Sequence, residues 1–76
     1  MKITQTKEIE APGLGEKIKT ARLATRKPLG ELAYKAGMST ANWYRIEAEN
    51  MKSMSIETLR TIEKVLGVDF GVKFPD

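Results

Sequence analysis

The chain has 76 residues, enough for one small domain, and a net charge of +3. It contains neither Cys nor His, which excludes disulfides, Cys/His zinc sites and thiolate nucleophiles. No apolar run approaches the roughly 20 residues that span a membrane, and a signal-peptide pattern is missing, so we expect a cytoplasmic protein. Residues 1–37 hold eight basic and four acidic side chains, which suits contacts with phosphate, although charge alone is more typical of a solvated surface.

The N-terminal residues have the spacing of a strand and are followed by chain-breaking residues. Ile3 and Ile9, like Thr4 and Thr6, lie an even number of positions apart, which predicts a short strand over residues 2–9. A Gly-Leu-Gly at 13–15 then precedes the first helix. It lacks the further Gly or Lys-Ser/Thr of a phosphate loop.

The first helix is predicted over residues 14–25. Its apolar face consists of residues at helical spacing: Leu14, Ile18 and Ala21. The junction after this helix is basic at Lys27, next to a second helix that starts at Leu29. Because amides at a helix N-terminus favour an anion, we expect a phosphate to bind between Lys27 and the amide of Leu29.

Residues 29–47 are predicted to form two short helices hinged at Gly37. The apolar stripe of the first helix, over 29–36, is Leu29, Leu32, Ala33 and Ala36. Gly37 suits the positive φ at a helix end, and Ser39 is a good N-cap for the second helix, over 40–47. Two helices joined by a short turn with Gly make a helix-turn-helix, whose second helix typically enters the major groove of DNA.

The residues of the helix over 40–47 divide between two sides. Trp43 and Ile46 face inward, and core packing explains Trp43 better than a stacking platform for bases does. The outward residues are predicted to contact bases: Thr40, Ala41, Tyr44 and Arg45. Arg45 suits a contact with a base, such as bidentate pairing with guanine, or with a phosphate more than a surface ion pair. A groove or phosphate contact and ordinary surface packing explain Tyr44 equally well.

A polar loop over 48–55 and a last helix over 56–66 complete a predicted core of residues 14–67. Ser55 is the expected N-cap, Gly67 ends the helix, and the buried stripe is Ile56, Leu59, Ile62 and Leu66. Residues 68–74 then alternate with the period of a strand, the apolar members being Val68, Phe70, Val72 and Phe74.

This C-terminal strand needs a partner surface. It could pair with residues 2–9 of the same chain or with its own copy in a second subunit. We favour the second arrangement, which predicts a homodimer with these contact residues: Val68, Phe70, Val72 and Phe74.

From Leu14 to Phe70 the chain resembles the Cro/phage-repressor helix-turn-helix family (XRE-like). The resemblance depends on the joint spacing of Gly15, Ile18 and Arg22, of Leu32-Ala33, Gly37 and Ser39, of Arg45-Ile46-Glu47, and of Ile56, Leu59 and Leu66-Gly67-Val68. It implies an all-α fold of four helices, here with a short C-terminal strand, and an ion pair between Arg22 and Glu47. The tail resembles HipB-type antitoxins, in which such a strand joins two subunits, and this implies a toxin as a further partner.

The resemblance also implies contacts with DNA phosphates around the third helix: Lys27, Leu29, Ser39, Asn42, Asn50, Lys52 and Ser53. Solvated loop positions explain Lys52 and Ser53 equally well, and Asn50 is a turn former first. Pro28-Leu29 stands where the family often has Ser/Thr-Gln, so the contact made by that Gln is lost here.

The sequence therefore predicts a single domain, residues 1–76, that binds double-stranded DNA sequence-specifically as a homodimeric transcriptional regulator, a repressor of its own gene. The alternative is an antitoxin-type interaction module that neutralises a partner protein, with DNA binding secondary. No nucleophile and base are spaced as a recognisable unit, so we expect no enzymatic activity, cofactor or metal.

Overall fold

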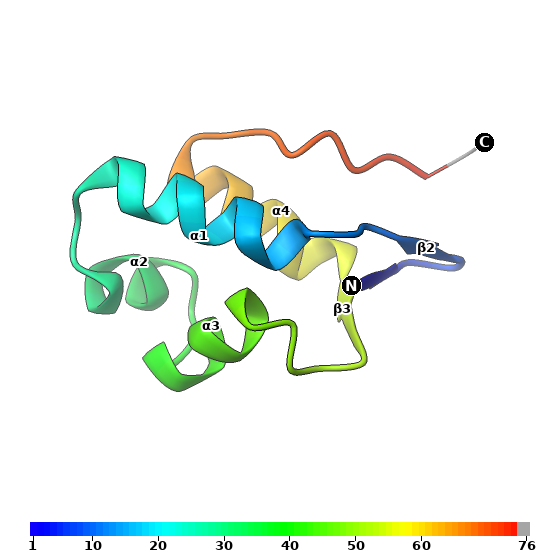
Figure 1. Cartoon of the computed structure of the whole chain (residues 1–76), viewed down its shortest axis with the longest axis horizontal. Coiled ribbons are helices and arrows are strands. Elements are labelled where there is room, and N and C mark those ends of the chain that lie inside the picture. The colour runs from blue at the N-terminus through cyan, green and yellow to red at the C-terminus, as the bar shows by residue number, and fades with distance from the viewer. Residues whose placement is uncertain (75–76) are drawn as a thin grey trace.

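The computed structural model describes residues 1–74, in which four helices pack beside a small three-stranded sheet (Figure 1). In chain order the elements are β1 (Lys2–Thr4), β2 (Glu8–Glu10), α1 (Leu14–Thr25), α2 (Leu29–Lys35), α3 (Thr40–Glu47), β3 (Ser53–Ser55) and α4 (Ile56–Leu66). The last two residues of the predicted domain, 75 and 76, lie outside the described residues.

The helices begin and end close to the predicted positions, and the causes are local. Ser39 caps α3 by accepting a hydrogen bond at 3.1 Å from the backbone N–H three residues later, and Ser55 caps α4 in the same way at 3.2 Å. Gly37 and Gly67 follow α2 and α4 with φ of 71°, a conformation that favours glycine. The four predicted helices are thus confirmed.

The core lies between the helices and the inner face of the sheet. Trp43 is fully buried, as the sequence predicted, and so is Ile3 of β1. The predicted helical stripes supply the other large, fully buried side chains: Leu14, Ile18, Leu32, Ile46, Leu59 and Ile62. Each such side chain contributes about 1.5–3 kcal/mol when it leaves water.

The sheet has the order β2-β1-β3 and differs from the prediction in two respects. The single strand predicted over 2–9 is instead an antiparallel hairpin of β1 and β2, with Ile3 opposite Ile9 and a turn over 5–7. The predicted polar loop over 48–55 contains β3, which pairs with β1 in parallel. The hairpin turn was missed because Gln5-Thr6-Lys7 contains neither Gly nor Pro.

Residues 68–74 contain no strand, so the prediction of a C-terminal strand is wrong for this part of the described chain. Gly71 turns the backbone with φ of 74°, and its N–H donates to Asp69 Oδ1 at 2.7 Å. Such a turn, stabilised by an Asp side chain, interrupts the extended backbone that a strand needs.

Side chains of α4 hold this tail in place. Glu63 Oε2 accepts a hydrogen bond from the Phe70 N–H at 2.7 Å, and Arg60 Nη2 donates to the Val72 carbonyl at 2.5 Å. Arg60 also pairs with Glu63 at 2.7 Å. Two backbone groups that a strand ladder would use are therefore satisfied by α4.

The four predicted dimer residues pack largely on their own chain. Val72 is buried, Phe70 and Phe74 are partly buried against the core, and Val68 remains 37% exposed. Intrachain packing therefore accounts for most of the apolar alternation that suggested a strand.

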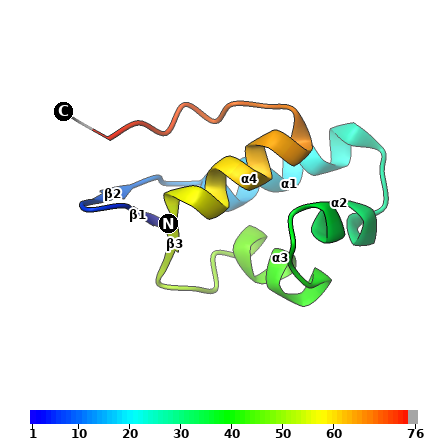
Figure 2. The ribbon, with the colours of Figure 1, turned by 180° about the vertical axis from the view of Figure 1, so that it is seen from behind.

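The tail and α3 lie on opposite sides of the pair formed by α1 and α4. Both views of the ribbon show the tail running back along this pair, while α2 and α3 lie on the other side (Figures 1 and 2). The tail is therefore separated from the surface that presents α3.

Candidate nucleic-acid interface

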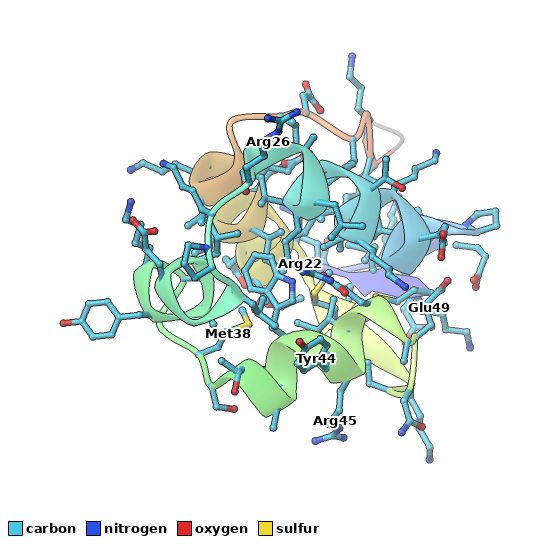
Figure 3. All side chains as sticks on the ribbon, turned by 60° about the vertical axis from the view of Figure 1, so that its left-hand side comes forward. Arg22, Arg26, Met38, Tyr44, Arg45 and Glu49 are labelled. Atoms are coloured by element: carbon cyan, nitrogen blue, oxygen red, sulfur yellow. The ribbon has the colours of Figure 1, made fainter. Side chains whose placement is uncertain are left out.

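α3 presents one face to solvent and packs the other into the core. The predicted base-contact residues are all exposed: Thr40, Ala41, Tyr44 and Arg45. Figure 3 shows Arg45 pointing away from the body of the protein. The opposite side of the helix carries Trp43 and Ile46, at 0% and 1% exposed. This arrangement leaves one face of α3 open for contact with a partner.

A largely desolvated ion pair fixes α3 against α1. Arg22 Nε donates to Glu47 Oε2 at 2.5 Å and Arg22 Nη2 donates to Glu47 Oε1 at 2.9 Å. The Trp43 indole N–H donates to the same carboxylate at 2.7 Å. Bonding to Glu47 raises the pKa of Arg22 above its usual value. The ion pair implied by the family resemblance is therefore present, and it locks the orientation of α3.

Two further contacts form where α1 meets α3: a close backbone approach at Gly15 and a cation–π contact of Arg22. A Cβ on Gly15 of α1 would lie 2.9 Å from the Ile46 carbonyl oxygen and even closer to that of Glu47, so only glycine allows this approach. The Arg22 guanidinium lies 5.9 Å from the centroid of the Tyr44 ring, a cation–π distance that supports Tyr44 on the exposed face.

A comparison with protein families matches residues 16–71 to the Cro/C1-type helix-turn-helix DNA-binding domain. The chain belongs to this family. No curated protein and no solved structure gave a match. The family and the fold together identify a DNA-binding regulator in which α2 and α3 are the helix-turn-helix.

Most of the predicted phosphate contacts of this Cro/C1-type domain are exposed: Lys27, Ser39, Asn50, Lys52 and Ser53. Leu29 is half-buried against the core at the first position of α2, which leaves its backbone as the part suited to a phosphate. The Asn42 side chain is also half-buried and directs its amide towards the Met38 sulfur at 3.9 Å. Their contacts with DNA stay predictions.

The sequence reading missed one charged contact near α3. The Met1 ammonium lies 2.8 Å from Glu49 Oε1, in the loop after α3, and 2.9 Å from Glu10 Oε1 on β2. Glu49, and then Glu10, raise the pKa of this ammonium above its usual value of 8.0. No local pattern predicts such a contact, because the groups come from distant parts of the chain.

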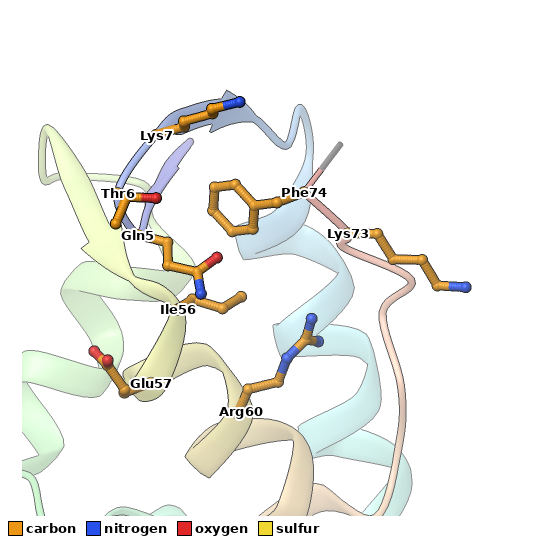
Figure 4. A pocket seen from close by; sticks show the side chains of 8 residues that line it. All are labelled: Gln5, Thr6, Lys7, Ile56, Glu57, Arg60, Lys73 and Phe74. Atoms are coloured by element: carbon orange, nitrogen blue, oxygen red, sulfur yellow. The ribbon is translucent and has the colours of Figure 1, made fainter. Parts of the chain in front are cut away.

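An open hollow of about 1040 Å³ lies between the hairpin turn, the start of α4 and the tail (Figure 4). None of its lining residues comes from α2 or α3: Gln5, Thr6, Lys7, Ile56, Glu57, Arg60, Lys73 and Phe74. Lys7 and Lys73 point outward from it, and Arg60 is bonded to the tail. The hollow is thus separate from the helix-turn-helix.

Within residues 1–74 the structure holds no cluster of three or more His, Cys, Asp or Glu side chains suited to a metal ion. The helices described over the same range are too short or too polar to cross a membrane.

Proposed function

We propose that this Cro/C1-type domain binds DNA sequence-specifically as a homodimer and represses transcription, including that of its own gene. The observation that carries the proposal is the exposed face of α3, with Arg45 directed outward from a helix that the Arg22–Glu47 pair holds fixed. A side chain that reads bases must be held in one orientation relative to the groove, and this cluster supplies that constraint.

Arg45 would make most of the base-specific contacts, because the neighbouring side chains have fewer hydrogen-bonding groups. Arg45 can pair bidentately with the O6 and N7 atoms of guanine, whereas Ala41 offers only a methyl contact to thymine. Thr40 and Tyr44 supply single hydroxyl groups. One helix of this kind specifies few base pairs, so two copies on a pseudo-palindrome, with half-sites about 34–36 Å apart, would double the information read.

Homodimerisation is supported by this requirement and by two exposed apolar side chains outside α3. Leu23 of α1 is 58% exposed and Val68 after α4 is 37% exposed. In the tail Val68 is exposed, while Val72 stays buried in its own chain. We therefore propose a dimer contact that includes Val68 and Leu23 rather than a pair of C-terminal strands from two subunits.

Fluorescence anisotropy tests the proposal with two duplexes, one from the DNA upstream of the protein's own gene and one of random sequence, over a salt series. We expect tighter binding to the upstream duplex that persists at moderate salt, and a dimer in sedimentation of the complex. Equal, weak binding to both duplexes that vanishes with salt would show only non-specific attraction to phosphate and would overturn the proposal.

The second candidate function is an antitoxin-type module that binds a partner protein. It is favoured by Tyr34 on α2, a large aromatic residue that is 83% exposed. A protein complex that is lost in Tyr34→Ser, with DNA binding unchanged, would support this role. In either role the chain acts by binding and not by catalysis, a proposal that the absence of Cys and His from the sequence supports.

A further inference from the structure

The hairpin of β1 and β2 precedes the residues that match the family, 16–71, and it is attached directly to the segment that follows α3. β1 pairs in parallel with β3, and the register places Lys2 beside Ser53 and Ile3 beside Met54. Thr4 Oγ1 adds a hydrogen bond to the Met54 carbonyl at 3.5 Å. The hairpin is therefore held against the segment that contains two predicted phosphate contacts, Lys52 and Ser53.

Lys2 and Ser53 lie on the same, outer face of the sheet. Successive side chains of a strand point to opposite faces, and Ile3 and Met54 are buried at 0% and 4% exposed. Their neighbours Lys2 and Ser53 are both exposed, as is Lys52 immediately before β3. Since adjacent strands are separated by about 4.8 Å, the pairing brings the Lys2 and Ser53 side chains together on one small surface, with Lys52 next to it along the chain.

This surface is close to the end of the recognition helix. Glu49 lies two residues after α3, and its carboxylate is 2.8 Å from the Met1 nitrogen, next to Lys2. With α3 in the major groove, the sugar-phosphate backbone that borders the groove passes near the ends of the helix. A cation held at that position meets a phosphate.

Two carboxylates near Lys2 share one other cation, the Met1 ammonium. Glu10 is opposite Lys2 in the β1–β2 register, and its Oε1 lies 2.9 Å from the Met1 ammonium. The same ammonium bonds Glu49. In the part of the chain that the structure describes, neither Lys2 nor Lys52 forms an ion pair, so both ammonium groups remain available to an external anion.

We infer that Lys2 is an additional DNA-backbone contact, which the N-terminal hairpin brings beside Lys52 and Ser53 and which extends the binding surface beyond the helix-turn-helix. The inference rests on the proposed DNA-binding function. It names a phosphate contact, so Lys2 contributes equally to every DNA sequence.

The test compares Lys2→Gln with Lys7→Gln, which removes the same charge from the turn of the same hairpin, beside the hollow of Figure 4. Anisotropy is measured with the upstream and the random duplex over a salt series. We expect Lys2→Gln to reduce the slope of log K against log salt by about 0.9 and to weaken binding to both duplexes about fivefold near 0.15 M salt. Lys7→Gln should keep the wild-type slope, and Lys2→Arg should restore it.

Each other outcome overturns the inference. A wild-type slope for Lys2→Gln would remove Lys2 from the interface, and equal loss in Lys2→Gln and Lys7→Gln would show a long-range charge effect without contact. If Lys2→Gln lowers the midpoint of thermal unfolding and Lys2→Arg restores folding but not the slope, Lys2 has only a structural role. A wild-type chain that binds neither duplex would overturn the proposed function itself, which distinguishes the two failures.

Discussion

Two Arg–Glu pairs occupy the two sides of the α1–α4 layer and bond different partners. Arg22 and Glu47 lie 25 residues apart and join α1 to α3. Arg60 and Glu63 lie three residues apart on α4, and each uses a further atom to bond the backbone of the tail. The first pair fixes one helix against another, whereas the second fixes a segment without regular structure.

The two pairs also differ in the solvent exposure of their side chains. The Arg22 and Glu47 side chains are 13% and 5% exposed, but Arg60 is 46% exposed beside Glu63 at 8%. Removing one partner of a desolvated pair leaves an uncompensated charge, while a partly solvated cation is compensated by water. The side that presents α3 should therefore respond to substitution more strongly than the side that holds the tail.

The largest effect is expected for Arg22→Ala. The Glu47 carboxylate would keep the Trp43 indole N–H but lose the guanidinium, so the free energy of unfolding should fall by about 3–5 kcal/mol. Urea denaturation followed by the fluorescence of Trp43, the one Trp of the chain, measures the change. The double variant Arg22→Met/Glu47→Leu should recover much of this loss of stability. A loss below about 1 kcal/mol for Arg22→Ala would contradict the prediction, because it is the magnitude expected for a surface ion pair.

A smaller effect is expected for Glu63→Ala. Its loss leaves the Phe70 N–H without its acceptor and Arg60 without its carboxylate, which should lower the free energy of unfolding by about 1.5–3 kcal/mol. Amide hydrogen exchange at Phe70 should accelerate, while DNA affinity should fall only as far as the proposed Val68 contact is disturbed, because the tail lies away from α3. Glu57→Ala, an exposed position on the same helix, is the control. Unchanged exchange at Phe70 would show that packing alone holds the tail.

Substitutions of two glycines also test the difference between the side that presents α3 and the side that holds the tail. Gly15→Ala places a Cβ against the carbonyl groups at the end of α3, which should cost about 1–3 kcal/mol and weaken DNA binding by shifting α3. Gly71→Ala meets no atom within 4 Å, so only its φ of 74° opposes it, at about 1–2 kcal/mol, and DNA binding should be weakened less than by Gly15→Ala. Thermal unfolding and anisotropy separate the two. Equal effects on DNA binding would contradict the separation of the two sides.

The helices could be predicted from the sequence because their signals are local. Apolar stripes, the caps Ser39 and Ser55 and the glycines at 37 and 67 each act within a few residues. The inward position of Trp43 and the outward position of Arg45 followed from the same periodicity. The family resemblance supplied the Arg22–Glu47 pair, which no local pattern contains.

The remaining elements depend on contacts between distant residues. β3 consists of Ser53, Met54 and Ser55, which have little strand propensity, and it forms because β1 lies beside it. The tail has the alternation of a strand, yet Glu63 and Arg60 bind its backbone. The Asp69-Phe70-Gly71 turn was the one local signal against a strand.

The most direct test of the account is the affinity of Arg45→Ala for the upstream duplex and for the random duplex, measured beside Lys73→Ala on the tail. If α3 reads the operator, Arg45→Ala should lose about 1–3 kcal/mol on the upstream duplex and much less on the random one, and Lys73→Ala should match the wild type on both. Equal losses for Arg45→Ala on the two duplexes would make Arg45 a phosphate contact. Wild-type affinity of Arg45→Ala for both would contradict the claim that the exposed face of α3 is the DNA-binding surface.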